Sequence, residues 1–373
     1  MRSNPLETLS NLGQSIWLDY IDRRILDDGT LKALIENDRL TGLTSNPAIF
    51  EKAISQGEAY AETITRLRSA GVALEEMYRQ LVLADIARAA DIFRPVYAAS
   101  GHRDGYVSIE VSPLLARDTE ATLVEARALW KQLARPNIMI KVPGTRQGIP
   151  AIRQLLVEGI NVNVTLLFSV ERYLEVLSAY LDALEARRAS GLPLEDVASV
   201  ASFFLSRIDV KIDQLLDAEI DAGGKAADRA RALRGQAAIA SAASAYRRFR
   251  EVKAGPRWRK LEAAGAGSQR LLWASTGTKD RLYNDTKYVE ALIAPDTVNT
   301  LPRETLDAYR DHGEPAVRID RAIERAETVK RGLFDLGIDM RAIEDELELE
   351  GIEKFIKPYR SLLDAFERIV GPE

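Results

Sequence analysis

The stretch Asn137-Ile138-Met139-Ile140-Lys141-Val142 is a short apolar run with a single lysine near its end. A run that is rich in isoleucine and valine and lacks polar alternation is typical of a parallel strand buried on both faces. A second run, Asn161-Val162-Asn163-Val164-Thr165, places both asparagines and the threonine on one face, because side chains alternate along a strand. The two runs therefore predict buried strands that carry polar groups on one face.

Similar runs recur along the whole chain, with helical stretches between them. Apolar residues have helical spacing in Leu74–Ala98, Glu120–Leu133 and Val170–Arg188. Strand and helix alternate about eight times, which is typical of a (β/α)8 TIM barrel; a doubly wound open sheet is the competing arrangement. The expected strands are Ser15–Tyr20, Leu40–Ser45, Tyr106–Val111, Asn137–Val142, Asn161–Phe168, Ala198–Phe204, Arg270–Ser275 and Asp296–Thr300.

Polar residues toward the ends of these runs decide between the two arrangements. Taken singly, each has a structural explanation, such as a lysine that reaches water or a carboxylate that caps the next helix. Barrel enzymes place catalytic groups at the C-terminal ends of many strands, whereas an open sheet gathers them near one switch point. Six or more strands carry such a residue, which favours a barrel with one active site. The residues are Asp19, Asn46, Glu110, Lys141, Asn163, Thr165, Ser202 and Ser275.

The chain has 373 residues, and two segments account for its length beyond a minimal barrel. Ile208–Lys260 is an Ala-, Arg- and Lys-rich helical stretch with an expected break at Ala222-Gly223-Gly224, and the chain after Pro302 is highly charged and helical. We find no internal repeat, low-complexity tract or linker. We therefore expect a single domain over residues 1–373, with a barrel core at about 12–302 and a helical tail at 303–373 that packs back onto it.

Composition excludes several classes of function. The chain has no cysteine, so disulfides, thiolate nucleophiles and zinc–sulfur sites are excluded, and its two histidines have no partner at metal-ligand spacing. A net charge of -5 does not indicate the basic surface that binding to nucleic acid or an anionic membrane needs. No apolar run is long enough to span a bilayer, and residues 1–13 lack the apolar part of a signal peptide. We expect a cytoplasmic enzyme that needs no metal or cofactor.

The remaining residue types suit chemistry on a carbonyl group. A lysine surrounded by Ile, Met and Val can lose its charge by desolvation, and the free amine forms an imine with a ketone. Asp19 and Glu110 can supply the proton transfers that this reaction needs. Neutral hydrogen-bonding side chains at Asn46, Asn163, Thr165 and Ser202 can hold sugar hydroxyls. Arg207 and Lys279, which follow the sixth and seventh strands, are the expected anion clamp.

Two longer motifs make the chain recognisable. They are Thr44-Ser45-Asn46-Pro47 and Asn163-Val164-Thr165-Leu166-Leu167-Phe168-Ser169, and with Ser108–Pro113, Ile138–Thr145 and Ala201–Asp209 they occur in the order and spacing of one family. From about Leu12 to Pro302 the chain resembles the transaldolase family. The resemblance implies a barrel enzyme that moves a dihydroxyacetone unit from sedoheptulose 7-phosphate or fructose 6-phosphate. The implied acceptors are glyceraldehyde 3-phosphate and erythrose 4-phosphate, in the non-oxidative pentose phosphate pathway.

The resemblance also implies roles for individual residues. Lys141 would form the Schiff base, Asp19 would deprotonate the C4 hydroxyl, and Glu110 would shuttle protons through a water held with Thr165. Asn46, Asn163, Ser202 and Phe204 match substrate-lining positions of the family, Arg207 matches a phosphate contact, and Ser275 ends the seventh strand. Many members carry an arginine in an Ala-Ser-Phe-Arg segment after that strand. Here the segment reads Ala274-Ser275-Thr276-Gly277-Thr278-Lys279, so we expect Lys279 to replace the arginine.

Other functions stay open. A related fructose 6-phosphate aldolase releases free dihydroxyacetone, but it carries Gln and Tyr where this chain has Glu110 and Phe204, so both positions favour transfer. A barrel that only binds sugar phosphates would be expected to lack the lysine or a carboxylate. A protein with a purely structural role leaves the polar strand residues unexplained. The extra helices are compatible with a homo-oligomer.

Overall fold

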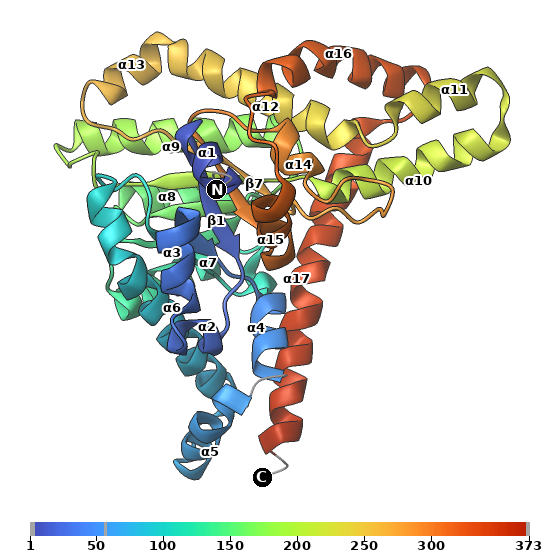
Figure 1. Cartoon of the computed structure of the whole chain (residues 1–373). Coiled ribbons are helices and arrows are strands. Elements are labelled where there is room, and N and C mark those ends of the chain that lie inside the picture. The colour runs from blue at the N-terminus through green and yellow to red at the C-terminus, as the bar shows by residue number, and fades with distance from the viewer. Residues whose placement is uncertain (1–3, 56–57, 371–373) are drawn as a thin grey trace.

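Eight parallel strands form a closed barrel in which each strand pairs with the next in sequence and β8 pairs with β1 (Figure 1). The structure is a computed structural model that describes residues 4–55 and 58–370. The strands are β1 (Gln14–Asp19), β2 (Leu40–Thr44), β3 (Tyr106–Glu110), β4 (Ile138–Pro143), β5 (Val162–Leu167), β6 (Ser199–Phe204), β7 (Arg270–Ala274) and β8 (Thr297–Leu301). The predicted TIM barrel is confirmed, and each predicted strand end lies within one residue of the observed end.

Most residues of these strands are buried, because one face lines the barrel interior and the other lies beneath helices. The interior is closely packed between β1 and β2. Gly42 on β2 lies against the indole of Trp17 on β1, and a Cβ atom at Gly42 would be only 2.5 Å from that ring. A residue without a side chain is therefore required where these two strands pack.

Helices lie between successive strands and form the outer layer. The three helices predicted from periodicity are confirmed to within one residue as α6, α7 and α9. No helix in the described part of the chain combines the length and the apolar character that crossing a membrane requires. The helices and 3-10 turns up to the insertion, and those just after it, are α1 (Pro5–Asn11), α2 (Arg23–Asp27), α3 (Thr30–Asp38), α4 (Pro47–Ser55), η1 (Glu58–Tyr60), α5 (Ala61–Ser69), α6 (Leu74–Ala99), η2 (Pro113–Leu115), α7 (Thr119–Leu133), α8 (Gly148–Val157), α9 (Val170–Ala189), α14 (Lys287–Ala291) and α15 (Arg303–His312).

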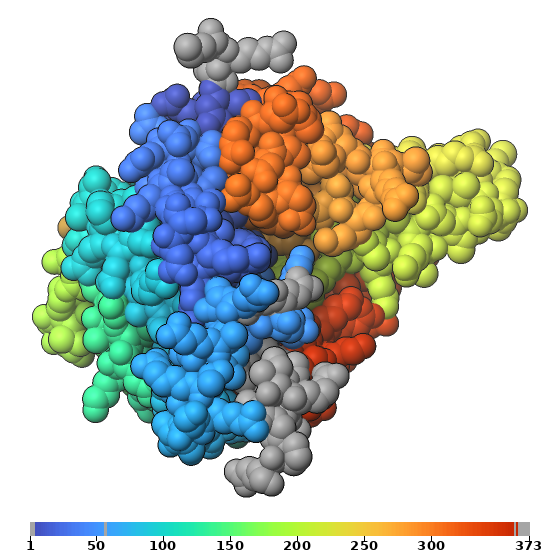
Figure 2. Space-filling view, turned by 60° about the horizontal axis from the view of Figure 1, so that its bottom comes forward, coloured from blue at the N-terminus to red at the C-terminus, as the bar shows by residue number. Residues whose placement is uncertain are grey.

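The insertion between β6 and β7 folds as four helices, α10 (Ser206–Ala222), α11 (Gly224–Leu233), α12 (Ala237–Ala254) and α13 (Pro256–Glu262). The predicted break at Gly223 is confirmed, but breaks at Gly235 and Gly255 were not predicted. Gly235 has φ +70°, and a Cβ atom there would lie 2.6 Å from the ring of Tyr283, so this break depends on a tertiary contact. Figure 2 shows the α10–α11 hairpin projecting from the body of the molecule in yellow-green.

The tail after α15 contains α16 (Ile319–Asp335) and the long α17 (Met340–Val370). α16 packs on α12 of the insertion, and α17 packs against α4, α6, α10 and β5. In Figure 1, α17 is the long red-orange helix that runs past α4. Leu347 and Phe355 are buried apolar residues of α17. The prediction of a helical tail that packs back onto the barrel is confirmed for the described residues.

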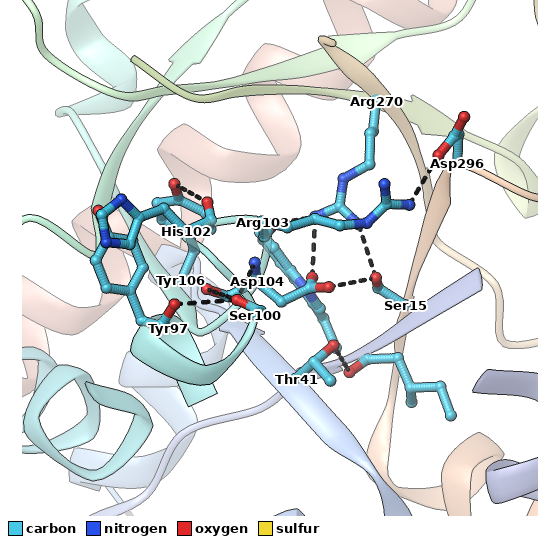
Figure 3. Close-up of polar contacts among 12 residues, drawn as sticks. Ser15, Thr41, Tyr97, Ser100, His102, Arg103, Asp104, Tyr106, Arg270 and Asp296 are labelled. Atoms are coloured by element: carbon cyan, nitrogen blue, oxygen red, sulfur yellow. Dashed lines mark hydrogen bonds and ion pairs between the residues drawn. The ribbon is translucent and has the colours of Figure 1, made fainter. Parts of the chain in front are cut away.

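A buried polar network ties β1, β3 and β7 together at the N-terminal end of the barrel (Figure 3). Arg270, the first residue of β7, forms an ion pair of 2.9 Å with Asp104, which lies just before β3. The hydroxyl of Ser15 on β1 donates to the same carboxylate at 2.8 Å and accepts from Arg270 at 2.7 Å. The side chains of Arg270 and Asp104 are only 5% and 10% exposed. This end of the barrel is therefore closed by charges that satisfy one another, and it is the end opposite to the catalytic groups of barrel enzymes.

Candidate active site

Lys141 and Glu110 face each other across two neighbouring strands at the C-terminal end of the barrel. They are paired in register between β4 and β3, so both side chains lie on the same face of the sheet. Lys141 Nζ lies 3.3 Å from Glu110 Oε2, and the two side chains are 6% and 3% exposed. Burial raises the pKa of Glu110, while the positive charge of Lys141 acts in the opposite direction. Glu110 is therefore a buried carboxylate that can accept a proton next to an amine.

Two further contacts fix the position of the Lys141 amine. It donates a hydrogen bond of 3.4 Å to the carbonyl oxygen of Ser45, directly after β2. It also lies 5.3 Å from the centre of the Phe355 ring, on α17 of the tail. The amine is thus held between two barrel strands and a helix that covers the barrel end.

The amine borders a cavity of about 80 Å³. Residues from β1, β2, β4, β6, β7 and β8, or from segments just after these strands, line it together with α17. The lining residues are Asp19, Thr44, Asn46, Lys141, Ser202, Phe204, Arg207, Ala274, Ser275, Thr300 and Phe355. Most residues predicted for the site are thereby brought together around one small space.

Asp19, the last residue of β1, is held by a chain of hydroxyl groups. Thr44 on β2 donates a hydrogen bond of 2.7 Å to Asp19 Oδ1 and lies 2.7 Å from the hydroxyl of Thr300 on β8. Burial raises the pKa of Asp19, whereas Lys141, the Thr44 hydrogen bond and Arg207 lower it. Asp19 therefore borders the cavity with a carboxylate whose pKa depends on its burial and on these neighbours.

Asn163 reaches the cavity through Ser202. The Ser202 hydroxyl donates to Asn163 Oδ1 at 2.7 Å, and the amide nitrogen of Asn163 donates to the Ser108 hydroxyl at 3.0 Å. Asn163 is fully buried and is not among the lining residues, so its direct role here is to orient Ser202. Thr165, two residues along β5, has a buried hydroxyl with no hydrogen-bond partner within the described residues.

Asn46 caps the next helix and also borders the cavity. Its side-chain oxygen accepts a hydrogen bond of 3.0 Å from the backbone N–H of Ile49 in the first turn of α4. This is a local helix-start contact of the kind that asparagine makes well. Asn46 also lines the cavity beside Lys141, and its amide nitrogen can still donate hydrogen bonds because the cap uses only the side-chain oxygen.

Arg207, in the first turn of α10, is packed between two aromatic rings. Its guanidinium carbon lies 5.2 Å from the ring centre of Phe204 and 5.6 Å from that of Phe355. Its Nη1 atom is buried and has no hydrogen-bond partner in the part of the chain that the structure describes. A fixed guanidinium with unused donors at the edge of a cavity suits a phosphate group.

Backbone strain accompanies two of these positions. Leu166, directly after Thr165, has φ +60°, and the pairing of β5 with β6 shifts register between Val164 and Leu167. Ser275, directly after β7, has φ +55°, and its hydroxyl lies 2.8 Å from that of Ser206. Residues other than glycine in this conformation cluster at functional sites, where surrounding structure holds them.

Lys279 lies apart from the other predicted residues. Its side chain is exposed and borders a surface depression with Asp285 and His312, not the Lys141 cavity. The loop after β7 is drawn toward the insertion by an ion pair of 2.7 Å between Asp280 and Arg234. The position of Lys279 therefore does not support its predicted role as the second phosphate cation.

Several site residues were not predicted from the sequence. Thr44 is the last residue of β2 and Thr300 the last but one of β8, so both could have been found by the same reasoning as Asp19. Nothing in the sequence indicated that Phe355 belongs to the site, because it lies in the charged tail, far from the strands in sequence. Within the described ranges, no group of three or more His, Asp or Glu side chains could hold a metal ion.

Two of the larger cavities border α17. One, of about 360 Å³ between α4, α6 and α17, is bordered by Glu110, so this carboxylate lies between Lys141 and a second space. The other, of about 670 Å³, lies between α9, α16 and α17 and is lined by none of the predicted site residues.

Comparisons with known proteins agree with this arrangement. The family model described as Transaldolase/Fructose-6-phosphate aldolase matches residues 16–366. Transaldolase 2 of a Nostoc species is 47% identical over 372 residues, which covers 98% of each chain. Transaldolase 1 of Streptomyces avermitilis is 48% identical over 361 residues, or 96% of this chain and 94% of its own. The transaldolase of Thermobifida fusca is 47% identical over 362 residues, 97% of each chain.

These matches extend through the insertion and the tail as well as the barrel. The family model includes the position of Phe355 on α17, and the relatives are aligned over nearly their whole length. The chain belongs to the transaldolase/fructose-6-phosphate aldolase family.

Proposed function

We propose that the protein is a transaldolase, which moves a dihydroxyacetone unit from a ketose phosphate to an aldose phosphate through an imine on Lys141. One observation carries the proposal: the buried Lys141 amine lies 3.3 Å from Glu110 and lines one cavity with Asp19. Imine chemistry on a ketone needs a nucleophilic amine and groups that move protons beside it. The relatives named transaldolase support the same reaction.

The first step is imine formation. Glu110 takes a proton from Lys141, and the free amine attacks the ketone carbon of sedoheptulose 7-phosphate or fructose 6-phosphate. The resulting carbinolamine loses its hydroxyl as water, with the proton supplied by Glu110. Thr165, whose buried hydroxyl has no hydrogen-bond partner in residues 4–55 and 58–370, is suited to hold that water beside the carboxylate.

The second step breaks the C3–C4 bond of the bound sugar. Asp19 removes the proton from the C4 hydroxyl, the bond opens, and its electron pair passes into the imine to give a three-carbon enamine. The aldose phosphate leaves. Arg207 binds the phosphate group, while Asn46, Ser202 and Ser275 hold hydroxyl groups against the wall that Phe204 provides. No metal or cofactor takes part, because the imine is the electron sink.

The third step is transfer. The enamine carbon attacks the aldehyde carbon of glyceraldehyde 3-phosphate or erythrose 4-phosphate, and the aldehyde oxygen takes the proton from Asp19. Water then hydrolyses the new imine with Glu110 as the acid–base group, which frees the product ketose and Lys141. Sugar phosphates are thus both donors and acceptors, in the non-oxidative pentose phosphate pathway.

A transfer assay tests the proposal. Purified protein with fructose 6-phosphate and erythrose 4-phosphate should form sedoheptulose 7-phosphate and glyceraldehyde 3-phosphate in equal amounts. Lys141→Ala should form neither while keeping the fold. Folded, unsubstituted protein that forms no sedoheptulose 7-phosphate would contradict the proposal. One domain over residues 1–373, a cytoplasmic location and a homo-oligomer stay predictions from the sequence.

A further inference from the structure

Among the described residues of the tail, Phe355 alone lines the wall of the Lys141 cavity. The other lining residues belong to barrel strands or to the segments that directly follow them. The Phe355 ring is 4% exposed and lies 5.3 Å from Lys141 Nζ and 5.6 Å from the guanidinium carbon of Arg207. A single aromatic side chain therefore covers both the imine-forming amine and the phosphate-binding cation.

Contacts made by the preceding two and a half turns of α17 hold the helix in place. Lys211 of α10 forms ion pairs of 2.6 Å with Glu346 and 2.7 Å with Glu350. Gly351 lies against the side chain of Leu166, the strained residue next to Thr165, and a Cβ atom at Gly351 would be 3.0 Å from it. These contacts set the depth at which Phe355 enters the site.

The helix is weaker on the other side of Phe355. Pro358 lies inside α17 and has no N–H, so the carbonyl of Lys354 lacks its usual helical hydrogen bond. The cavity beneath the ring is about 80 Å³, whereas pockets for drug-sized ligands span about 300–1,000 Å³. The covered arrangement therefore leaves less room than a whole sugar phosphate needs, and it suits the three-carbon unit that remains after the aldose phosphate leaves.

We propose that Phe355 is a specificity-determining residue that sets the ratio between transfer of the three-carbon enamine and its release. This inference rests on the proposed transaldolase function. In transfer, the enamine carbon forms a bond to the aldehyde carbon, and the aldehyde oxygen gains a proton. In release, the enamine carbon takes a proton from water instead. A second water then adds to the imine, the C–N bond breaks, and free dihydroxyacetone and the lysine amine result.

The two fates differ in whether water reaches the enamine carbon before an acceptor does. An apolar ring over Lys141 excludes water from the covered site, and water exclusion protects reactive intermediates from side reactions. The same ring holds the Arg207 guanidinium by a cation–π contact, so that it stays in place to bind the phosphate of the acceptor. Both effects favour transfer.

The test compares three variants with the unsubstituted protein. Phe355→Ala opens the cover, Phe355→Leu keeps apolar volume but loses the ring, and Leu349→Ala is the matched control at a half-exposed position of the same helix. Two rates are measured for each: release of dihydroxyacetone from fructose 6-phosphate without acceptor, and formation of sedoheptulose 7-phosphate with erythrose 4-phosphate. Borohydride trapping on Lys141 and circular dichroism accompany both.

We expect Phe355→Ala to raise the ratio of release to transfer about tenfold, which corresponds to a modest change in relative barrier heights. Phe355→Leu should raise it less, and Leu349→Ala should leave it unchanged. An unchanged ratio in Phe355→Ala that still forms the Lys141 adduct would overturn the inference. If Phe355→Ala does not fold, an unchanged ratio of release to transfer in Phe355→Leu would also overturn the inference. Failure of the unsubstituted protein to form the adduct would overturn the proposed function itself.

Discussion

Glu110 Oε2 lies 3.3 Å from Lys141 Nζ, and the register of β3 and β4 places the two residues directly opposite each other. No other described residue gives the Glu110 carboxylate a hydrogen bond. The Glu110 carboxylate therefore has no competing partner among the described residues, and it can take a proton that Lys141 loses.

Glu110→Gln should lower the rate of imine formation and imine hydrolysis about 100-fold or more, because an amide cannot accept the proton of Lys141. The C3–C4 cleavage step, which uses Asp19, should change much less. Rapid-quench measurement of imine formation under single-turnover conditions separates the two steps. Glu120→Gln, at an exposed position of α7, is the control; equal rates in Glu110→Gln and the control would remove Glu110 from the proton transfers.

The Thr44 hydrogen bond should set the acid side of the pH profile for cleavage. Asp19 acts as a base only when ionised, and burial raises its pKa above 3.8 while the Thr44 hydroxyl lowers it. Removing the hydroxyl in Thr44→Val raises the pKa of Asp19 further, so the rate should begin to fall at a higher pH. Thr44→Ser keeps the donor and should restore the original profile. Identical pH profiles of kcat for the two variants would contradict the assignment.

Arg270→Met should destabilise the fold by about 3–5 kcal/mol, because it leaves the buried carboxylate of Asp104 without its counter-charge. Arg103→Ala removes a more exposed ion pair with Asp296 in the same network (Figure 3) and should cost less than about 1 kcal/mol. Urea unfolding measures both values. Both variants should keep the Lys141 chemistry when folded, because the network lies at the opposite end of the barrel.

Glu344 on α17 should make stability depend on pH. Burial raises its pKa to about 8, helped by the negative charges of Glu171, Asp345 and Asp339 and opposed by Lys330. The folded state then keeps a proton that the unfolded chain loses, so stability falls as pH rises between about 4.5 and 8. Glu344→Gln should lose this dependence and melt at a higher temperature than the parent at pH 9.

The control for this prediction is Asp335→Asn, at an exposed position of α16. It should follow the parent protein at both pH 6 and pH 9. If Glu344→Gln melts no higher than the parent at pH 9, the raised pKa of Glu344 in the folded protein is wrong.

The barrel could be predicted from the sequence because its strands are buried on both faces. Continuous apolar runs bounded by polar or helical segments mark such strands, and their ends were correct to within one residue. The polar residues toward the strand ends also stood out, since an Asp19 or Lys141 within an apolar run is unusual. Because all strands of a parallel barrel end on the same side, closing the barrel brings these residues together.

Features that depend on tertiary contacts could not be predicted. The helices of the insertion are interrupted at Gly235, where the chain packs against Tyr283. The position of the loop that contains Lys279 depends on the ion pair between Asp280 and Arg234. Phe355 reaches the active site because α17 folds back across the barrel end. Each of these contacts joins segments distant in sequence, and no local pattern encodes it.

The most direct test of the central claim is mass spectrometry after incubation with fructose 6-phosphate and borohydride, followed by peptide mapping. Reduction fixes the imine, so we predict a stable adduct retaining the three carbons of dihydroxyacetone on the peptide that contains Lys141. Lys141→Arg should give no adduct under the same conditions. An adduct on a different lysine, or none in protein shown to be folded, would contradict the assignment of Lys141 as the nucleophile.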